Sequence, residues 1–296
     1  MTRRIALLVN PTSGKGRGAR LLVPVADRLR TAGVEVVVIV GRDADEAFDL
    51  VRTVVAGDPA VDGVVAVGGD GMVNLAVQVV AGTDVPLGII PAGTGNDVAR
   101  ALGIPRDDAG AAADLVLAAT TRAVDLGRAD GRWFAGVLGS GFDSMVNERA
   151  NRMSWPTGRS RYNLAILAEL RVFRPVPFVL ELDGDRWETE AMLVAVGNGS
   201  SYGGGMRVCP DARLDDGLLD VTVLGPISKP EFLRVFPSVY KGTHVHHRAV
   251  TLRRARTVVL SSPGVTAYAD GERVAALPVR CDAVPAALNV FTAPGT

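Results

Sequence analysis

The chain has 296 residues, which is enough for two domains of ordinary size, and its 48% of hydrophobic residues exclude an intrinsically disordered protein. Lysine plus arginine equals aspartate plus glutamate at 32 each, so the net charge of zero gives no sign of a nucleic-acid partner. The two cysteines, Cys209 and Cys281, are too few and too far apart for a disulfide framework or a zinc site, and they favour a reducing compartment.

Strand and helix patterns alternate from Ile5 to Ala119. The expected strands are short, apolar and rich in β-branched residues, and they cover Ile5–Val9, Val34–Val40, Val64–Val67 and Leu87–Ile90. The expected helices cover Ala19–Thr31, Asp45–Ala56, Met72–Ala81, Asp97–Leu102 and Ala109–Ala119. This alternation predicts an N-terminal α/β domain with a doubly wound, mostly parallel sheet.

The pattern changes near Val124–Gly127, where we place the boundary between a first domain, residues 1–124, and a second domain, residues 125–296. The strands expected after it are separated by turns such as Asp183–Asp185, and they cover Trp133–Leu138, Phe178–Leu182, Glu190–Val196, Leu218–Leu224, Thr257–Leu260, Val274–Val279 and Ala287–Phe291. Two helical patterns, Ser160–Phe173 and Lys229–Tyr240, interrupt them. We therefore expect a β-rich C-terminal domain that forms a mostly antiparallel sandwich.

Three glycine-rich segments directly follow expected strands of the first domain: Asn10–Gly16 (NPTSGKG), Gly68–Gly71 (GGDG) and Pro91–Asp97 (PAGTGND). Glycines let the backbone approach a phosphate closely, and the start of a helix presents N–H groups to an anion. Because the carboxyl ends of parallel strands lie along one edge of a sheet, the three turns should converge. The first segment lacks the Gly-Lys-[Ser/Thr] ending of a Walker A loop, and by itself it fits a plain βα turn equally well.

Asp70 lies within the second of these turns. A carboxylate among phosphates acts most naturally through Mg²⁺, because direct contact with a phosphate would be repulsive. The alternative is that Asp70 only caps the helix that follows. In the third turn, Thr94 and Asn96 can hydrogen-bond a nucleotide, and Asp97 can cap the next helix or orient a metal-bound water.

The three turns resemble the nucleotide-binding motifs of the diacylglycerol kinase catalytic domain, whose superfamily also holds sphingosine kinases and, more distantly, NAD kinases and phosphofructokinases. The resemblance covers nearly the whole chain, and its second-domain motifs are Gly139–Asp143, Asn198–Gly199, Tyr202–Gly205, Pro210–Asp220 and Asp270–Glu272. These motifs are similar to those of the soluble bacterial branch, and within it to the actinobacterial diacylglycerol kinases. Met72 departs from the usual threonine after Gly-Gly-Asp-Gly, a change that should affect local packing more than chemistry.

The resemblance implies roles for individual residues. ATP contacts are implied for Asn10, Pro11, Thr12, Ser13, Gly14, Gly41, Gly68, Gly69, Asp70, Gly71, Met72, Val73, Asn74 and Thr94. A carboxylate–water–Mg²⁺ network beneath the phosphates is implied for Asp70, Asp97 and Asp125. A second, structural Mg²⁺ is implied at Arg213, Asp216 and Leu218, with backbone carbonyls from the first and last; a metal-free Asp-Asp-Gly turn is the alternative.

The segment Asp270–Glu272 is the candidate for acid–base catalysis. Phosphoryl transfer depends mainly on positioning and charge stabilisation, and it also needs a carboxylate that accepts the proton of the acceptor hydroxyl. The resemblance implies that this base lies in the segment, with Glu272 as the first choice and Asp270 as the second. A bare hairpin turn is the alternative, because Asp-Gly is common between strands.

Four functions are open. The resemblance implies a kinase that uses ATP and Mg²⁺ to convert diacylglycerol to phosphatidic acid. The others are a kinase for ceramide, a sphingoid base or a glycolipid; an NAD kinase, which the second-domain motifs disfavour; and a nucleotide-binding regulator without catalysis. Retention of Asp70, Asp270 and Glu272 argues against the regulator. Relatives suggest a homodimer.

A lipid kinase of this sequence would have to visit the membrane from the cytoplasm. No apolar run approaches the roughly 18–20 residues that span a bilayer, and the apolar stretch Ile5–Val9 is too short for a signal peptide. Arginines around Trp155 precede an apolar helix, a pattern that suits an anionic lipid surface or a solvated face beside a core helix. For the histidine-rich stretch at 244–247 we expect an exposed loop, because no partner lies at metal spacing.

Overall fold

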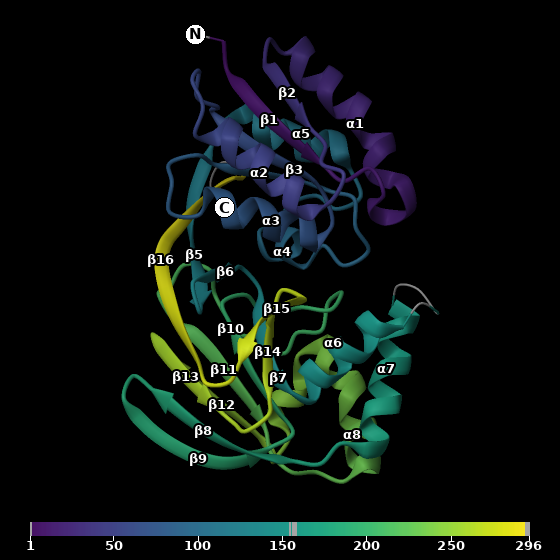
Figure 1. Ribbon diagram of the computed structural model, residues 1–296, viewed down its shortest axis with the longest axis vertical. Helices are drawn as coiled ribbons and strands as arrows, with labels where there is room; N and C mark the ends of the chain where they lie inside the picture. The colour runs from purple at the N-terminus through teal and green to yellow at the C-terminus, as the bar shows by residue number, and fades with distance from the viewer. Residues whose placement is uncertain (1, 154, 156–158, 294–296) are drawn as a thin grey trace. The chain divides into compact units, whose positions relative to one another are not determined.

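The structure is a computed structural model that describes residues 2–153, 155 and 159–293 (Figure 1). Its two compact units are Met1–Leu126 with Pro285–Thr296, and Gly127–Val284. A single boundary near residue 124 therefore misses one feature, since the C-terminal segment belongs to the first unit. The cause is the last strand, β16 (Val279–Phe291), which pairs with β13 in the second unit and then places Val290 beside Leu87 of β4 in the first.

The first unit contains a parallel sheet with strand order β2-β1-β3-β4. Its strands are β1 (Arg4–Val9), β2 (Glu35–Ile39), β3 (Gly63–Gly68) and β4 (Leu87–Pro91), and its helices are α1 (Ser13–Thr31), α2 (Ala44–Val55), α3 (Asp70–Val80), α4 (Asp97–Ala101) and α5 (Ala109–Ala118). Helix α1 packs against α5 and α2 against α3, and β3 and β4 are buried along their whole length. The predicted doubly wound, mostly parallel sheet is confirmed.

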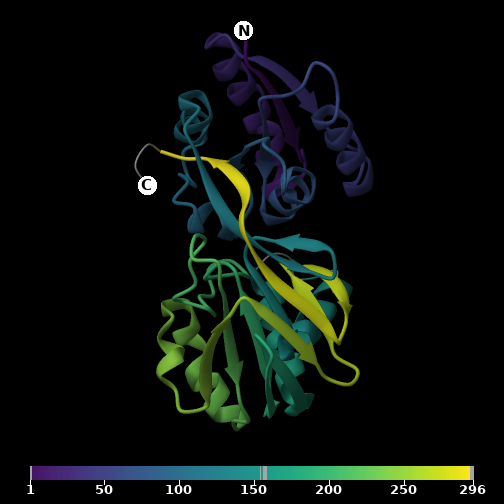
Figure 2. The same ribbon diagram turned by 90° about the vertical axis from the view of Figure 1, so that its left-hand side faces the viewer.

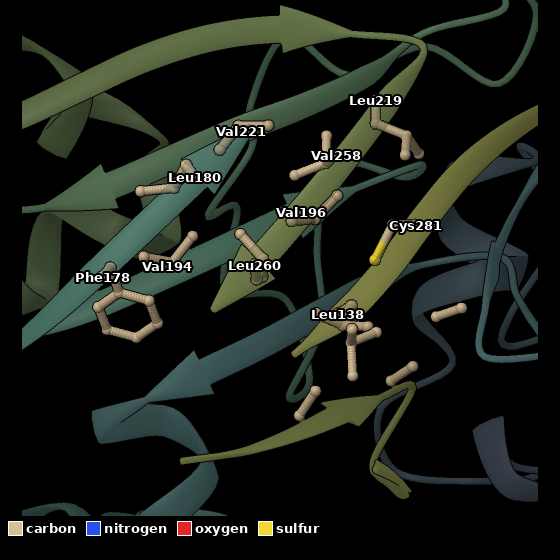
Figure 3. Close-up of a cluster of buried hydrophobic side chains, with 14 of the residues drawn as sticks. Leu138, Phe178, Leu180, Val194, Val196, Leu219, Val221, Val258, Leu260 and Cys281 are labelled. Atoms are coloured by element: carbon tan, nitrogen blue, oxygen red, sulfur yellow. The ribbon is translucent and has the colours of Figure 1, made fainter. Parts of the chain in front are cut away.

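The second unit is a sandwich of two mostly antiparallel sheets, as predicted. One sheet contains β13, β8 and β9 with the first part of β16, and the other has the order β12-β11-β10-β7-β14-β15. The strands are β6 (Arg132–Phe134), β7 (Val137–Gly141), β8 (Val176–Leu182), β9 (Asp185–Ala191), β10 (Leu193–Gly197), β11 (Leu219–Leu224), β12 (Val250–Ala255), β13 (Thr257–Ser261), β14 (Thr266–Ala269) and β15 (Glu272–Ala276). Figure 3 shows how apolar side chains of both sheets, among them Leu180, Val196 and Leu260, meet in a common core.

Strand β5 (Thr121–Ala129) was not among the predicted elements. It pairs with β6 and with β16, and Figure 2 shows it running beside the yellow β16. The strand expected at Trp133–Leu138 is instead divided into β6 and β7. The break lies at Ala135 and Gly136, whose N–H groups are bound by a side chain described below.

Three helices cover one side of the second unit: α6 (Phe142–Arg152), α7 (Arg159–Val172) and α8 (Lys229–Val235). Their apolar side chains form a second core, in which Phe142 contacts Phe232 edge to face. The helix expected at Lys229–Tyr240 continues beyond α8 as the 3₁₀ segment η1 (Phe236–Lys241).

A further 3₁₀ segment, η2 (Thr243–His246), carries the histidine-rich stretch. The prediction of an exposed loop is wrong for His244, whose side chain turns into the unit and is only 5% exposed. In the part of the chain that the structure describes, no helix combines the length and the apolar character needed to cross a membrane.

Candidate active site

The first glycine-rich turn leaves the sheet beside the point where strand order reverses. Strand β1 lies between β2 and β3, and ligands of open α/β sheets bind outside the carboxyl ends of the strands at such a reversal. Asn10 fixes the turn, because its Oδ1 accepts hydrogen bonds from Thr12 N–H at 3.0 Å and from Thr12 Oγ1–H at 2.8 Å. Three successive left-handed residues follow, Gly14, Lys15 and Gly16, with φ of 55°, 58° and 84°.

The three glycine-rich turns lie against one another. A Cβ placed on Gly14 would be 1.9 Å from the carbonyl oxygen of Ala92, and one on Gly93 would be 2.5 Å from Gly69 Cα. Any side chain at these two glycines would therefore push neighbouring backbone away. The close approach leaves a surface of backbone at the carboxyl edge of the sheet, the kind of surface on which a phosphate can rest.

One hydroxyl group inside this surface has no protein partner. Ser13 Oγ is buried and has no hydrogen-bond partner among the residues that the structure describes. It lies between the first two turns, 2.7 Å from an ideal Cβ on Gly18 and 4.0 Å from one on Gly68. A buried hydroxyl left unsatisfied costs about 1–3 kcal/mol, and a phosphate oxygen would satisfy it.

Asp70 ties the second turn to the third. Its Oδ2 accepts the N–H of Asn96 at 2.8 Å and its Oδ1 accepts the N–H of Asp97 at 2.7 Å. Burial raises the pKa of Asp70, the nearby Asp97 raises it further, and the backbone N–H groups oppose both effects. The alternative that Asp70 only caps the helix that follows is wrong, because Gly69 is the N-cap of α3 without a side-chain cap bond, and the Asp70 carboxylate binds N–H groups at the start of α4 instead.

The third turn is held by its own polar residues. Asn96 has left-handed φ of 53° and bonds Gly93 twice, by its Oδ1 at 3.1 Å and its Nδ2 at 3.0 Å. Asp97 forms an ion pair with Arg100, which also donates to Gly95 O at 3.1 Å. Thr94, between Gly93 and Gly95 in the sequence, has an exposed side chain.

The other residues expected at ATP have varied environments. Pro11 and Gly41 are half-buried, and Gly41 lies at the turn after β2, where a Cβ would be 2.5 Å from Ala47 N. Val73 and Asn74 are buried in α3, Gly71 is exposed at its start, and the Met72 side chain lies against Gly68, 2.6 Å from an ideal Cβ there.

The third carboxylate of the expected Mg²⁺ network is engaged elsewhere. Asp125, in β5, is buried and accepts the N–H of Ala286 in β16 at 2.9 Å. Within the described residues, no group of three acidic, histidine or cysteine side chains is close enough to hold a metal ion. The expected network of Asp70, Asp97 and Asp125 runs through water and does not require direct contact with one ion, so it stays a prediction.

The two candidates for the base differ sharply. Asp270 has left-handed φ of 50°, and both its oxygens accept backbone N–H groups, from Ala135 and from Gly136, each at 2.9 Å. Glu272 is exposed at the start of β15. Asp270 therefore has a structural role, because its two hydrogen bonds fix the turn and separate β6 from β7. The Glu272 side chain is exposed and therefore accessible to a substrate.

At the expected structural metal site, the guanidinium group of Arg254 pairs with the carboxylate of Asp216. Asp216 Oδ1 accepts the N–H of Leu218 at 3.1 Å, and Oδ2 is paired with Arg254, which also reaches Asp220 at 3.3 Å. The Arg213 side chain pairs with Asp215, and the expected ligand role of the Arg213 backbone carbonyl stays a prediction. Since the one carboxylate is neutralised by a guanidinium, this arrangement does not fit a divalent cation. Sequence reasoning missed Arg254 because nothing local links it to a turn far back in the chain.

Replacing Arg254 by methionine is expected to lower the free energy of unfolding by roughly 1–3 kcal/mol, because Asp220 loses its partner in a pair that solvent partly screens, the Arg254 side chain being 44% exposed. Arg186→Met, in an exposed pair with Glu188, is the control and should leave the free energy of unfolding almost unchanged. Urea unfolding with Mg²⁺ and with EDTA measures both. We expect Mg²⁺ to leave the urea midpoint of the unmodified protein unchanged and to raise that of Arg254→Met. If EDTA lowered the urea midpoint of the unmodified protein, Arg254 would not be the counterion of Asp216.

Comparison with known proteins decides the family. The family model of the diacylglycerol kinase catalytic domain matches residues 4–129, and that of the YegS C-terminal NAD kinase beta sandwich-like domain matches residues 136–292. A diacylglycerol kinase of Mycobacterium tuberculosis (strain ATCC 25618 / H37Rv) is 48% identical over 294 residues, which cover 97% of this chain and 94% of that protein. The chain belongs to the diacylglycerol kinase family.

Solved structures agree with the fold of this family. A diacylglycerol kinase from Bacillus anthracis str. Sterne is similar with a TM-score of 0.75 at 22% identity, covering 99% of this chain and 97% of that one. An NAD kinase from Archaeoglobus fulgidus, solved in complex with ATP, gives a TM-score of 0.56 at 12% identity and covers 99% and 94%. These likenesses show that the two units have the expected architecture. The enzyme class, a kinase, follows instead from the family model and from the relative that is 48% identical.

Proposed function

We propose that this enzyme transfers the γ-phosphate of ATP to the free hydroxyl of diacylglycerol and so produces phosphatidic acid. The observation that carries the proposal is the packing of three glycine-rich turns around Asp70 at the carboxyl edge of the sheet. Diacylglycerol as the acceptor is supported by the relative that shares 48% of its residues and bears that name.

The first unit supplies the surface for ATP. Backbone N–H groups of the turns and the Ser13 hydroxyl would bind phosphate oxygens, and the missing side chains at Gly14, Gly69 and Gly93 permit the close approach. Bound Mg²⁺ would neutralise charge on the transferred phosphoryl group. Asp70 would orient waters of that ion, since its partly buried carboxylate keeps acceptor capacity beyond its bonds to backbone N–H groups.

The second unit supplies the proton acceptor. Glu272 would take the proton of the acceptor hydroxyl as the oxygen attacks the γ-phosphorus and ADP leaves. Asp270 would act as a positioning residue, because its bonds to Ala135 and Gly136 hold the turn from which β15 begins.

One assay separates the candidate functions. Purified protein, labelled ATP and Mg²⁺ are incubated with mixed micelles of diacylglycerol, ceramide, sphingosine or a glycolipid, and separately with NAD. We expect label in phosphatidic acid. Label in another lipid would change the acceptor, label only in NADP would remove the lipid-kinase proposal, and nucleotide binding without transfer to any acceptor would favour the regulator.

Contact with a membrane surface is part of the proposal. Helix α7 buries Ala165, Ile166 and Leu170 but leaves Leu164 and Leu167 44% and 55% exposed, and Trp155 is 79% exposed nearby in sequence. A helix that is apolar on two sides and lies among arginines suits the boundary between lipid head groups and acyl chains. The homodimer suggested by relatives stays a prediction, to be checked by light scattering.

Two glycines of the first turn provide a matched test of the ATP site. Both have positive φ, so either alanine variant should cost about 1–2 kcal/mol in backbone strain. Gly16→Ala meets nothing within 4 Å, whereas the Cβ of Gly14→Ala would collide with Ala92 O. We expect thermal stabilisation by Mg²⁺-ATP to persist in Gly16→Ala and to disappear in Gly14→Ala. Equal stabilisation of the two variants would argue against ATP at this turn.

A further inference from the structure

The strand on which Glu272 lies is weakly held by its sheet. Among the described residues, β15 pairs with β14 alone, because it is the edge strand of that sheet. The pairing is irregular, since the register shifts between Thr266 and Tyr268, and every residue of β15 is exposed or half-buried. A strand with one neighbour and few buried contacts opens easily. The position of Glu272 therefore depends on the side chains that attach the β14–β15 hairpin to the rest of the second unit.

Tyr268 gives the hairpin a large buried side chain, which is only 6% exposed. Its neighbours in β14, Ala267 and Ala269, belong to the core between the two sheets. Because successive residues of a strand point to opposite faces, Tyr268 points to the other face of its sheet, towards α6, which contacts β14 (Figure 1). The two alanines offer little surface for packing, so the attachment of the hairpin to the helical layer depends on Tyr268.

The Tyr268 hydroxyl completes this attachment, because it forms a hydrogen bond with the carboxylate of Glu148 in α6. An ionised carboxylate can only accept, so the phenol donates. Burial raises the pKa of Tyr268 and the charge of Glu148 raises it further, so the phenol keeps its proton at physiological pH. Glu148 is itself held in place, since it pairs with Arg152 one turn further along α6 at 3.6 Å. A single hydrogen bond thus joins the hairpin to a helix far back in the chain.

We propose that Tyr268 is a positioning residue for phosphoryl transfer, because its hydrogen bond to Glu148 fixes the hairpin that carries Glu272. The inference rests on the proposed function, in which Glu272 is the base. A base must lie within hydrogen-bond reach of the proton that it accepts, and a displacement of about 1 Å can cost up to 10²-fold in rate. Asp270 fixes the turn of the hairpin, and Tyr268 fixes the strand before the turn. Tyr268 lies opposite Arg273, the residue after Glu272, so a shift of one strand moves the other.

The test removes the donor and the acceptor of this hydrogen bond in turn. Tyr268→Phe keeps the ring but loses the hydroxyl, and Glu148→Ala loses the carboxylate. With labelled ATP and diacylglycerol micelles, we expect each variant to lower kcat on the order of 10-fold. The KM for Mg²⁺-ATP should stay unchanged, since the glycine-rich turns lie in the first unit. The double variant should lose no more activity than either single variant, because all three lack the same bond.

Two further variants separate positioning from a general structural effect. Glu148→Gln should keep most of the wild-type kcat, because its amide oxygen can still accept the phenol hydrogen. Tyr240→Phe, the same loss of a hydroxyl on η1, is the matched control and should keep the wild-type kcat. Circular dichroism checks that each variant is folded, and Glu148→Ala carries the test if Tyr268→Phe is not.

Hydrogen–deuterium exchange tests the attachment of the hairpin without catalysis. The backbone amides of β15 should exchange on the order of 10-fold faster in Tyr268→Phe and in Glu148→Ala than in the wild type, whereas those of β10 and β11 should not change. Wild-type kcat in both folded variants, or additive losses in the double variant, would overturn the inference. Absence of lipid phosphorylation by the wild type, with β15 still exchanging faster in Tyr268→Phe, would instead remove the proposed function.

Discussion

Glu272→Gln is expected to lower kcat by roughly 10²–10⁴-fold, the contribution of a positioned general base. Glutamine keeps the size and polarity of the side chain but cannot accept the proton of the acceptor hydroxyl. Because Glu272 is exposed, the substitution should leave the unfolding midpoint and the stabilisation by Mg²⁺-ATP unchanged. Steady-state kinetics with diacylglycerol, together with thermal unfolding, measures both quantities.

Asp270→Asn is the informative comparison for this variant. Its amide can still accept one of the two N–H groups, from Ala135 or Gly136, but the other is left facing an NH₂ group. A lost bond of this kind costs about 1–3 kcal/mol, so the midpoint should fall while some activity persists in the folded fraction. A fully active Glu272→Gln enzyme beside an inactive, stably folded Asp270→Asn enzyme would reverse the assignment of the base.

The two halves of the fold were not equally predictable from sequence. In the first unit, buried parallel strands are continuous apolar runs that end at turn residues, so β1, β3 and β4 were each found to within a residue or two. Strand β9 (DRWETEA) carries mainly polar side chains, and β12 (VTLRRA) has two consecutive arginines before its last residue, so neither has the apolar alternation of a half-buried strand. Pairing with distant neighbours fixes them, and a local pattern does not contain that information.

The candidate site, like the fold, could be predicted from sequence only in part. The clustering of glycines predicted three turns at one edge of the sheet, and the structure packs them together. What could not be predicted is which polar atom each carboxylate binds. Asp125 meets Ala286, Asp216 meets Arg254, and Asp270 meets Ala135, all across long stretches of chain. A carboxylate's availability for chemistry depends on those partners, so sequence alone left Glu272 and Asp270 as alternatives.

Asp70→Asn is expected to separate activity from stability most clearly. The pKa of Asp70 is raised in the folded protein, chiefly by burial, so folding favours the protonated form. The stability contributed by this group is present below its unfolded pKa of about 4 and is lost as pH rises through the higher folded value. At neutral pH the protein therefore maintains a carboxylate that its own fold disfavours, which is typical of a functional group.

The asparagine variant removes that partly buried charge but also weakens one of the bonds to the N–H groups of Asn96 and Asp97. Because these two effects oppose each other, the unfolding midpoint at pH 7 should change little. The affinity for Mg²⁺-ATP should fall on the order of 10²-fold, since the ion's waters would lose a carboxylate that orients them, and stabilisation by Mg²⁺-ATP should shrink accordingly. Thermal unfolding at pH 4 and pH 7, with and without Mg²⁺-ATP, measures the unfolding midpoint and its shift by Mg²⁺-ATP. The wild type should lose stability relative to the variant as pH rises, and a variant that keeps full stabilisation by Mg²⁺-ATP would show that Asp70 only joins the second turn to the third.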